Sequence, residues 1–271
     1  MTTAIVTDST TSLAPETLDR PDVRMVPLSF HFGAEETYTD KVDLSDEEFY
    51  EKLKASEEFP TTSQPPAGAF VEAYESLQDY DDILVLTISR ELSGTYDSAV
   101  TAADMVDTSV QVLDTRSAEM GSGLILLEAL RVVDEGGSFD DVRQAAERAI
   151  QSCQIFFAVG TLEYLAKSGR IGRAQRLVGT ALNVRPVLKV ENGVVVPHKR
   201  ARGRKRQLAA IAEEAKPPVA QGKTVYFGHI AAQSELTELC EKLGIQEPRI
   251  ATLGGVVGSH VGPGAYGLAH L

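Results

Sequence analysis

Short apolar runs of strand length alternate with amphipathic stretches through the first half of the chain. The candidate strands lie at residues 4–6, 24–30, 83–88 and 110–113. Apolar residues recur at helical spacing over residues 67–77 and 120–133, and the Ser-Asp-Glu-Glu sequence at 45–48 is a capping box that predicts a helix through Lys54. Strands separated by helices of this length indicate βαβ units and a largely parallel sheet.

After about residue 153 the pattern changes to strands with fewer helices between them. The Asn192-Gly193 pair favours a tight hairpin turn, because both residues tolerate positive φ angles. We therefore predict an α/β fold of two domains, residues 1–153 and 154–271, the second built on a mixed sheet. No low-complexity linker separates them, so we expect the domains to pack closely around a cleft. The candidate strands of the second domain are residues 155–159, 186–190, 194–196, 223–227 and 249–252.

The composition is that of a chain that buries a core. Of the 271 residues, 43% are hydrophobic and 24% are charged. These values exclude disordered, collagen-like and disulfide-stapled small proteins. No apolar run approaches the ~20 residues of a membrane span. The N-terminal sequence has no signal-peptide pattern, and the only cysteines, Cys153 and Cys240, are far apart, so we expect a cytoplasmic setting.

The charge is unevenly distributed along the chain. The formal net charge is −13, and residues 1–60 carry 14 acidic and 5 basic side chains. Residues 167–206 instead carry 12 basic side chains and one acidic one, Glu191. Such a segment either meets an anionic partner or forms a solvated face that balances the acidic half. Both interpretations remain open from the residues alone.

Most catalytic motifs are absent from the sequence. None of the five histidines stands at metal-ligand spacing from another His or a Cys, so we expect no metal site. There is no Gly-x-Ser-x-Gly elbow and no Walker motif, and residues 167–206 hold no aromatic side chain for stacking on nucleic-acid bases. The Gly-x-Gly-x-x-Gly match at 262–267 has no crossover helix after it. We therefore expect no independent kinase, hydrolase or dehydrogenase. We also expect no nucleic-acid partner, and a nucleic-acid-binding or regulatory protein that acts through residues 199–206 stays a third alternative.

Four segments rich in glycine and hydroxyl groups remain as candidate sites. They are residues 7–10, 60–66, 89–95 and 258–264. In the third, Ser93 and Gly94 precede a helix, whose N-terminus favours an anion such as a carboxylate or phosphate. Segment 7–10 alone is more typical of a helix cap and segment 60–66 of a turn with a helix cap. A lone histidine such as His260 is more often a core or surface residue than a ligand-binding group. Two hydroxyls, a helix N-terminus and the imidazole of His260 together form a set that can hold a carboxylate by hydrogen bonds.

The four segments also occur in an order that resembles a known family. Seven short motifs in register over ~260 residues are similar to those of the DegV family of bacterial fatty-acid-binding proteins. They are Thr-Asp-Ser-Thr at 7–10, Thr-Ser-Gln-Pro at 62–65, Leu-Ser-Gly-Thr-Tyr at 92–96, Ser-Ala-Glu-Met-Gly at 117–121, Leu-Glu-Tyr-Leu at 162–165 with Gly-Arg-Ile-Gly at 169–172, Arg-Pro-Val-Leu at 185–188, and His-Val-Gly-Pro-Gly-Ala at 260–265.

The resemblance implies both an architecture and a ligand. It implies a three-layer α/β/α domain with a mainly parallel sheet, a two-layer α/β domain with a mixed sheet, and one long-chain fatty acid in a tunnel between them. By resemblance, Thr62, Ser93 and His260 hold its carboxylate, and the expected supporting residues are Ser63, Gly94 and Thr95. No other cofactor is implied.

The resemblance further implies a partner. Family members of the fatty-acid-kinase type have no activity alone and present the carboxylate to a separate ATP-dependent kinase subunit, which makes acyl phosphate for phospholipid synthesis. We expect Arg170, Arg202 and Lys205 to face this kinase or, transiently, an anionic membrane surface. The alternative is a serine esterase with Ser93 as nucleophile and His260 as base, which also needs an orienting carboxylate such as Asp8.

Overall fold

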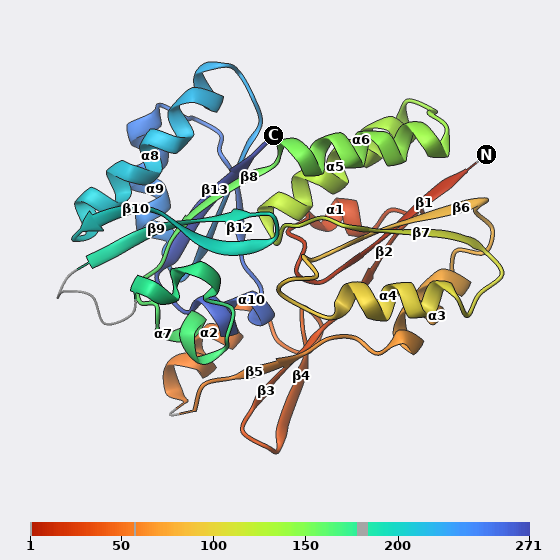
Figure 1. The fold of residues 1–271 in the computed structure, drawn as a ribbon, viewed down its shortest axis with the longest axis horizontal. Coiled ribbons are helices and arrows are strands. Elements are labelled where there is room, and N and C mark those ends of the chain that lie inside the picture. Colours follow the sequence, from red (N-terminus) through yellow and green to blue (C-terminus); the bar gives the residue numbers. More distant parts are fainter. Residues whose placement is uncertain (1, 57, 178–183) are drawn as a thin grey trace.

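A computed structural model, which describes residues 2–56, 58–177 and 184–271, contains a parallel sheet and a mixed sheet side by side (Figure 1). The parallel sheet has the order β2-β1-β6-β7. Its strands come from the first half of the chain: β1 (Thr3–Asp8), β2 (Val23–Val26), β6 (Asp82–Thr87) and β7 (Ser109–Asp114). This arrangement confirms the parallel sheet predicted from the alternation of strand and helix patterns.

Side chains alternate between the two faces of this sheet, and each face is covered by helices (Figure 1). Ile5 and Leu84 pack against α5 (Met120–Asp134) and α6 (Phe139–Ser152). Ala4 and Val85 pack on the other side against α3 (Ala67–Glu75) and α4 (Thr95–Ala103). The result is the expected three-layer unit. A short helix, α1 (Pro15–Leu18), follows β1.

The mixed sheet has six strands in the order β10-β9-β8-β13-β11-β12. Two helices, α8 (Arg204–Ala220) and α9 (Gln233–Leu243), cover one face through buried residues such as Leu208 and Leu236. The other face packs against the first half of the chain. The strands are β8 (Gln154–Ala158), β9 (Val184–Glu191), β10 (Val194–Arg202), β11 (Val225–Ile230), β12 (Arg249–Thr252) and β13 (Ala265–His270).

A third sheet, of three antiparallel strands in the order β4-β3-β5, projects below the other two (Figure 1). Its strands are β3 (Ser29–Phe32), β4 (Glu36–Thr39) and β5 (Thr61–Ser63), and α2 (Asp46–Ala55) packs on it. The helix α10 (Gly255–Val261) crosses from the second half of the chain to this sheet. A Cβ atom on Gly255 would lie 2.7 Å from Phe30 and 3.0 Å from Phe49, so glycine lets the helix approach these rings. Two short segments, α7 (Glu163–Lys167) and the 3₁₀ helix η1 (Gly172–Leu177), complete the described elements.

The elements of the structure differ from the sequence patterns at three places. The run 24–30 is two strands, β2 and β3, which belong to different sheets, with Pro27 and Leu28 between them. Thr62 lies on strand β5, whereas segment 60–66 alone is typical of a turn with a helix cap. Residues 265–267 of the glycine motif begin strand β13 in the middle of the mixed sheet.

Local signals gave two confirmed predictions. Ser45 and Glu48 form the capping box of α2, and Asn192 and Gly193, with φ of 51° and 81°, turn the β9–β10 hairpin. The division into domains at 153/154 stays a prediction. In the described ranges, no helix combines the length and apolar character needed to cross a membrane.

Candidate functional site

A cavity lies between the two halves of the molecule, with an empty volume of about 900 Å³ that includes space at its open mouth. Most lining side chains are apolar, for example Leu28 and Met120 from the first half and Ile155 and Val256 from the second. Such a lining suits a ligand with a long apolar part. The side chains with polar groups among the lining are Thr62, Ser93, Glu119, Arg170, His260 and Tyr266.

Thr62 and His260 meet at this cavity although they are far apart in the sequence. Thr62 lies on β5, where it pairs with Phe30 of β3, and His260 lies on α10. Their Oγ1 and Nε2 atoms are 2.7 Å apart. If Nε2 accepts from the hydroxyl, Nδ1 carries a proton, and if Nε2 donates, the threonine proton is free. Either tautomer leaves one donor for a ligand oxygen.

The electrostatics keep His260 neutral. Burial and, to a smaller extent, the positive charge of Arg170 lower its pKa to about 4. Its buried Nδ1 atom has no hydrogen-bond partner among the described residues. The site therefore offers a neutral imidazole with one ring nitrogen available.

Ser93 contributes a second hydroxyl from the residue pair that precedes α4. Its Oγ is 2.9 Å from Oγ1 of buried Thr95. A Cβ atom on Gly94 would lie 2.1 Å from Oε1 of Gln64, whose Nε2 donates to Ser98 at 2.9 Å. The glycine thus lets the segment around β5 dock against the N-terminus of α4, which brings Thr62 and Ser93 to the same cavity.

The two other expected supporting residues lie differently. Thr95 is buried behind Ser93 and does not line the cavity. Ser63 points to the other face of β5, because side chains alternate along a strand, and its Oγ is 2.8 Å from Nε2 of His31 on the exposed side. Neither Ser63 nor Gly94 is among the lining residues.

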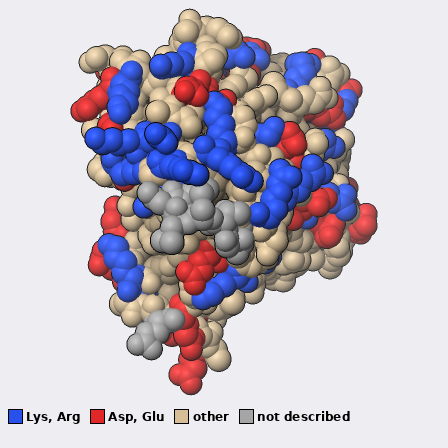
Figure 2. Space-filling view, turned by 60° about the vertical axis from the view of Figure 1, so that its left-hand side comes forward, with Lys and Arg blue, Asp and Glu red and all other residues tan. Residues whose placement is uncertain are grey.

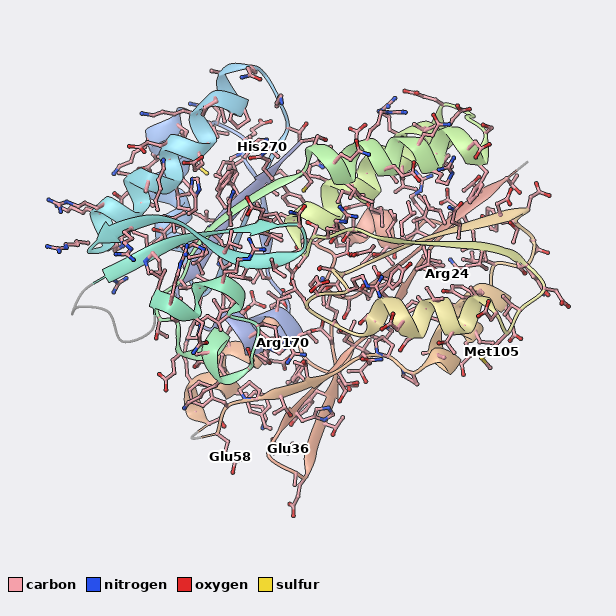
Figure 3. All side chains as sticks on the ribbon, in the orientation of Figure 1. Arg24, Glu36, Glu58, Met105, Arg170 and His270 are labelled. Carbon is pink, nitrogen blue, oxygen red and sulfur yellow. The ribbon has the colours of Figure 1, made fainter. Side chains whose placement is uncertain are left out.

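Arg170, for which the sequence predicts a contact with the kinase or a membrane surface, lines the cavity. It is partly buried, and Figure 3 shows it between α7 and α10. Its Nε donates to the carbonyl of Leu92 at 3.2 Å, and its Nη1 donates to the carbonyl of Ser168 at 2.7 Å. The side chain therefore connects the second half of the chain to the segment that carries Ser93. The sequence places Arg170 in a motif with Ile171 and Gly172, but it does not show that the side chain points to the cavity.

Asp8 holds two backbone segments together and lies outside the cavity lining. It is fully buried, and it accepts from the Thr10 amide at 2.9 Å and the Ile88 amide at 2.7 Å. The Thr-Asp-Ser-Thr motif therefore joins the ends of β1 and β6. It caps no helix, since α1 begins only at Pro15 and has no side-chain cap.

The basic segment 167–206 forms part of one outer face, and Figure 2 shows Lys and Arg side chains gathered there. Several members are in ion pairs with acidic neighbours: Lys167, Lys189, Lys199 and Arg204. Others are exposed and form no ion pair in the described part of the chain: Arg173, Arg176, Arg200, Arg202, Lys205 and Arg206. Arg202 and Lys205, at the junction of β10 and α8, do not line the cavity.

Comparison with known proteins identifies the family. The model for the DegV family, described as uncharacterised proteins, matches residues 2–271. Protein DegV of Bacillus subtilis is 33% identical over 99% of this chain and 98% of its own length. The chain belongs to the DegV family. This result confirms the resemblance recognised from seven motifs.

Solved DegV structures share the fold over the whole chain. The crystal structure of B. subtilis DegV, a fatty acid-binding protein, has a TM-score of 0.90 and covers 100% of this chain and 99% of its own. A DegV family protein from Thermus thermophilus, described as binding fatty acid, is 36% identical with a TM-score of 0.91 and covers 100% and 99% of the two chains. A stearic acid-binding protein from Eubacterium ventriosum is 27% identical with a TM-score of 0.89 and covers 100% and 98%. DegV proteins thus bind fatty acids.

Proposed function

We propose that this DegV protein binds one long-chain fatty acid in the cavity between its two halves, with the carboxylate held by Thr62, Ser93 and His260. The observation that carries the proposal is the neutral Thr62–His260 pair, joined at 2.7 Å on the wall of a largely apolar cavity. A carboxylate can accept from this pair and from the hydroxyl of Ser93. The guanidinium of Arg170, which acts electrostatically on His260, adds attraction for a negative head group.

The apolar lining supplies most of the binding free energy in this proposal. Burial of each methylene group contributes ~0.8 kcal/mol, so a C16–C18 chain contributes on the order of 10 kcal/mol before the entropic cost of binding. The head-group contacts then fix the orientation of the ligand more than its affinity. No cofactor is needed for such a role.

We further propose that the protein is not an enzyme by itself and works in the cytoplasm with a separate fatty acid kinase subunit. Ser93 is hydrogen-bonded to Thr95, and His260 to Thr62, so the described hydrogen bonds do not form a nucleophile–base pair. Asp8 is bound to Thr10 and Ile88 and does not orient the imidazole. Neutral donors leave a carboxylate oxygen available for phosphoryl transfer by the partner.

The exposed basic face is the proposed contact for this kinase, with a transient contact to an anionic membrane surface as a second use. Arg202 and Lys205 belong to the group of exposed cations without an ion pair in the described residues. Such a face attracts an acidic partner over distances up to the Debye length, ~8 Å at physiological salt.

The ligand is tested first by extraction of the purified protein in denaturing solvent, followed by mass spectrometry. We expect one equivalent of a long-chain fatty acid. In the protein stripped of lipid, Thr62→Ala and Ser93→Ala are each expected to weaken stearic acid binding by ~1–3 kcal/mol, because each removes a head-group hydrogen bond. An empty extract and no uptake of added fatty acid would refute the proposal. Unchanged affinity in both variants would refute the assignment of the carboxylate site.

The partner face is tested by charge reversal. Arg202→Glu combined with Lys205→Glu is expected to lower acyl phosphate formation with a fatty acid kinase subunit at least tenfold while stearic acid affinity stays the same. The matched control is Lys216→Glu, an exposed lysine near the other end of α8. Equal activity of the double variant and the control contradicts a role for this face. Weaker sedimentation with anionic vesicles in the double variant alone would support the membrane contact.

A further inference from the structure

Glu119 is an ionisable side chain on the wall of the cavity to which the proposed function gives no role. It lies between β7 and α5, is 3% exposed and lines the same cavity as Thr62 and His260. Its backbone has a φ of 49°, a conformation that residues other than glycine rarely adopt. Such conformations persist only where surrounding contacts enforce them.

Those contacts fix the backbone of Glu119 but leave half of its carboxyl group unpaired. Its amide donates to the carbonyl of Thr10 at 2.6 Å, and its own carbonyl accepts from the Gly123 amide at 2.8 Å. Its Oε2 accepts from Ser12 Oγ at 2.6 Å. Its Oε1 is buried and has no hydrogen-bond partner among the described residues. A buried polar atom without a partner is costly, so a hydrogen bond from a ligand to Oε1 would be favourable.

Glu119 belongs to a different part of the cavity from the head-group residues. Its charge neighbours are Lys41, Asp40 and Asp46 of the region around α2, and its charge also acts on Tyr50 and Tyr226. The charge that acts on His260 is Arg170. Glu119 and His260 come from different halves of the chain and line the same cavity, so a fatty acid with its carboxylate at His260 can pass Glu119 with its hydrocarbon chain.

We propose that Glu119 is a second polar subsite, which binds a hydroxyl group on the chain of a hydroxy fatty acid. This inference rests on the proposed function. A hydroxyl group suits the site because it can donate to Oε1 of a carboxylate or accept from a carboxylic acid. Burial raises the pKa of Glu119 to about 7, so both forms exist near neutral pH. A keto group can only accept, and an unsubstituted chain leaves Oε1 unpaired.

The test is a binding series on the protein stripped of lipid, by displacement of a fluorescent fatty acid. The probes are stearic acid and C18 acids with one hydroxyl near the carboxyl end, in the middle or near the methyl end. In the wild-type protein we expect one hydroxyl position to bind about tenfold more tightly than the others, because only one position reaches Oε1. Glu119→Leu is expected to abolish this preference and to retain stearic acid binding. Glu119→Gln, whose amide can still donate and accept, is expected to keep the preference.

The outcomes separate the two proposals. If the wild-type protein binds stearic acid but disfavours every hydroxy acid alike, the subsite is refuted and the fatty acid function stands. The same holds if Glu119→Leu folds and keeps the positional preference. If the wild-type protein binds no fatty acid at all, the proposed function fails, and the subsite with it. If Glu119→Leu does not fold, a wild-type protein without any positional preference still refutes the subsite.

Discussion

His260 is the residue whose protonation reports most directly on the proposed site. In the structure, burial and Arg170 lower its pKa to about 4 from an ordinary 6.5. A bound carboxylate at the same place favours the charged imidazole and is expected to raise that pKa. We therefore expect the ring signals of His260 to titrate with a midpoint near 4 in the lipid-free protein and at higher pH after stearic acid is added.

The measurement is NMR of the histidine ring protons over pH, with the spectrum of His260→Gln used to assign the signal. The lowered pKa of His260 also determines how the stability of the protein changes with pH. Because the folded pKa is below the unfolded one, the contribution of His260 to stability is complete above pH ~6.5 and falls as the pH drops toward 4. A lipid-free midpoint near 6.5, or no change with stearic acid, would contradict the placement of His260 beside the carboxylate.

For single residues, the sequence predicts which side chains serve the site better than it predicts where those side chains point. The family resemblance implies that Thr62, Ser93 and His260 hold a carboxylate, and all three line the cavity. Ser63 is an expected supporting residue, but strand alternation turns it to His31 on the other face. The charge of Arg170 favours a contact at the protein surface. Charge alone does not show that its guanidinium donates to the carbonyl groups of Leu92 and Ser168.

At the scale of elements, α10 is the helix that joins the site to the projecting sheet, and its glycines set how close it can come. A Cβ atom on Gly255 would lie 2.7 Å from Phe30 and 3.0 Å from Phe49. We expect Gly255→Ala to destabilise the protein by ~1–3 kcal/mol, because the core there is already filled. Since α10 carries His260, we also expect weaker stearic acid binding.

Gly68 provides the matched control for this substitution. It lies in α3, and a Cβ atom there would meet nothing within 4 Å. Gly68→Ala should raise the free energy of unfolding by ~0.5–1 kcal/mol, because alanine loses less backbone entropy than glycine in a helix. Urea unfolding followed by circular dichroism measures both variants. Equal stability of Gly255→Ala and Gly68→Ala would show that α10 is not tightly held against the two rings.

Elements were predictable from the sequence where their signal is local. The capping box at Ser45 and the Asn192-Gly193 turn are such cases, since each depends on neighbouring residues. The sheet β4-β3-β5 was not predicted, because its strands are only three or four residues long and pair across a gap in sequence. The sequence does not predict helix α10, because its glycines lower helix propensity. These glycines let the helix pack closely on the aromatic rings of Phe30, Phe49 and Tyr50.

At the scale of the whole molecule, the cavity lies where the two halves of the chain meet. Segments that follow strands of the parallel sheet, together with β5, line one side, and the mixed sheet and α10 line much of the other. Leu28 and Met120 on one side and Ile155 and Val256 on the other belong to a single buried cluster. A ligand between them therefore contacts both halves at once and stabilises the folded protein by mass action. The apolar lining, not the head-group site, is expected to set how large this stabilisation is.

A series of saturated fatty acids of increasing length tests that expectation. If the chain is buried, each added methylene group contributes ~0.8 kcal/mol, so affinity rises about fourfold per carbon until the cavity is filled. Beyond that length we expect affinity to level off or fall, because further methylenes stay in water or force the two halves apart. The melting temperature at fixed ligand concentration is expected to follow the same curve. Affinity that does not depend on chain length would place the hydrocarbon outside the cavity, since the carboxylate contacts are identical throughout the series.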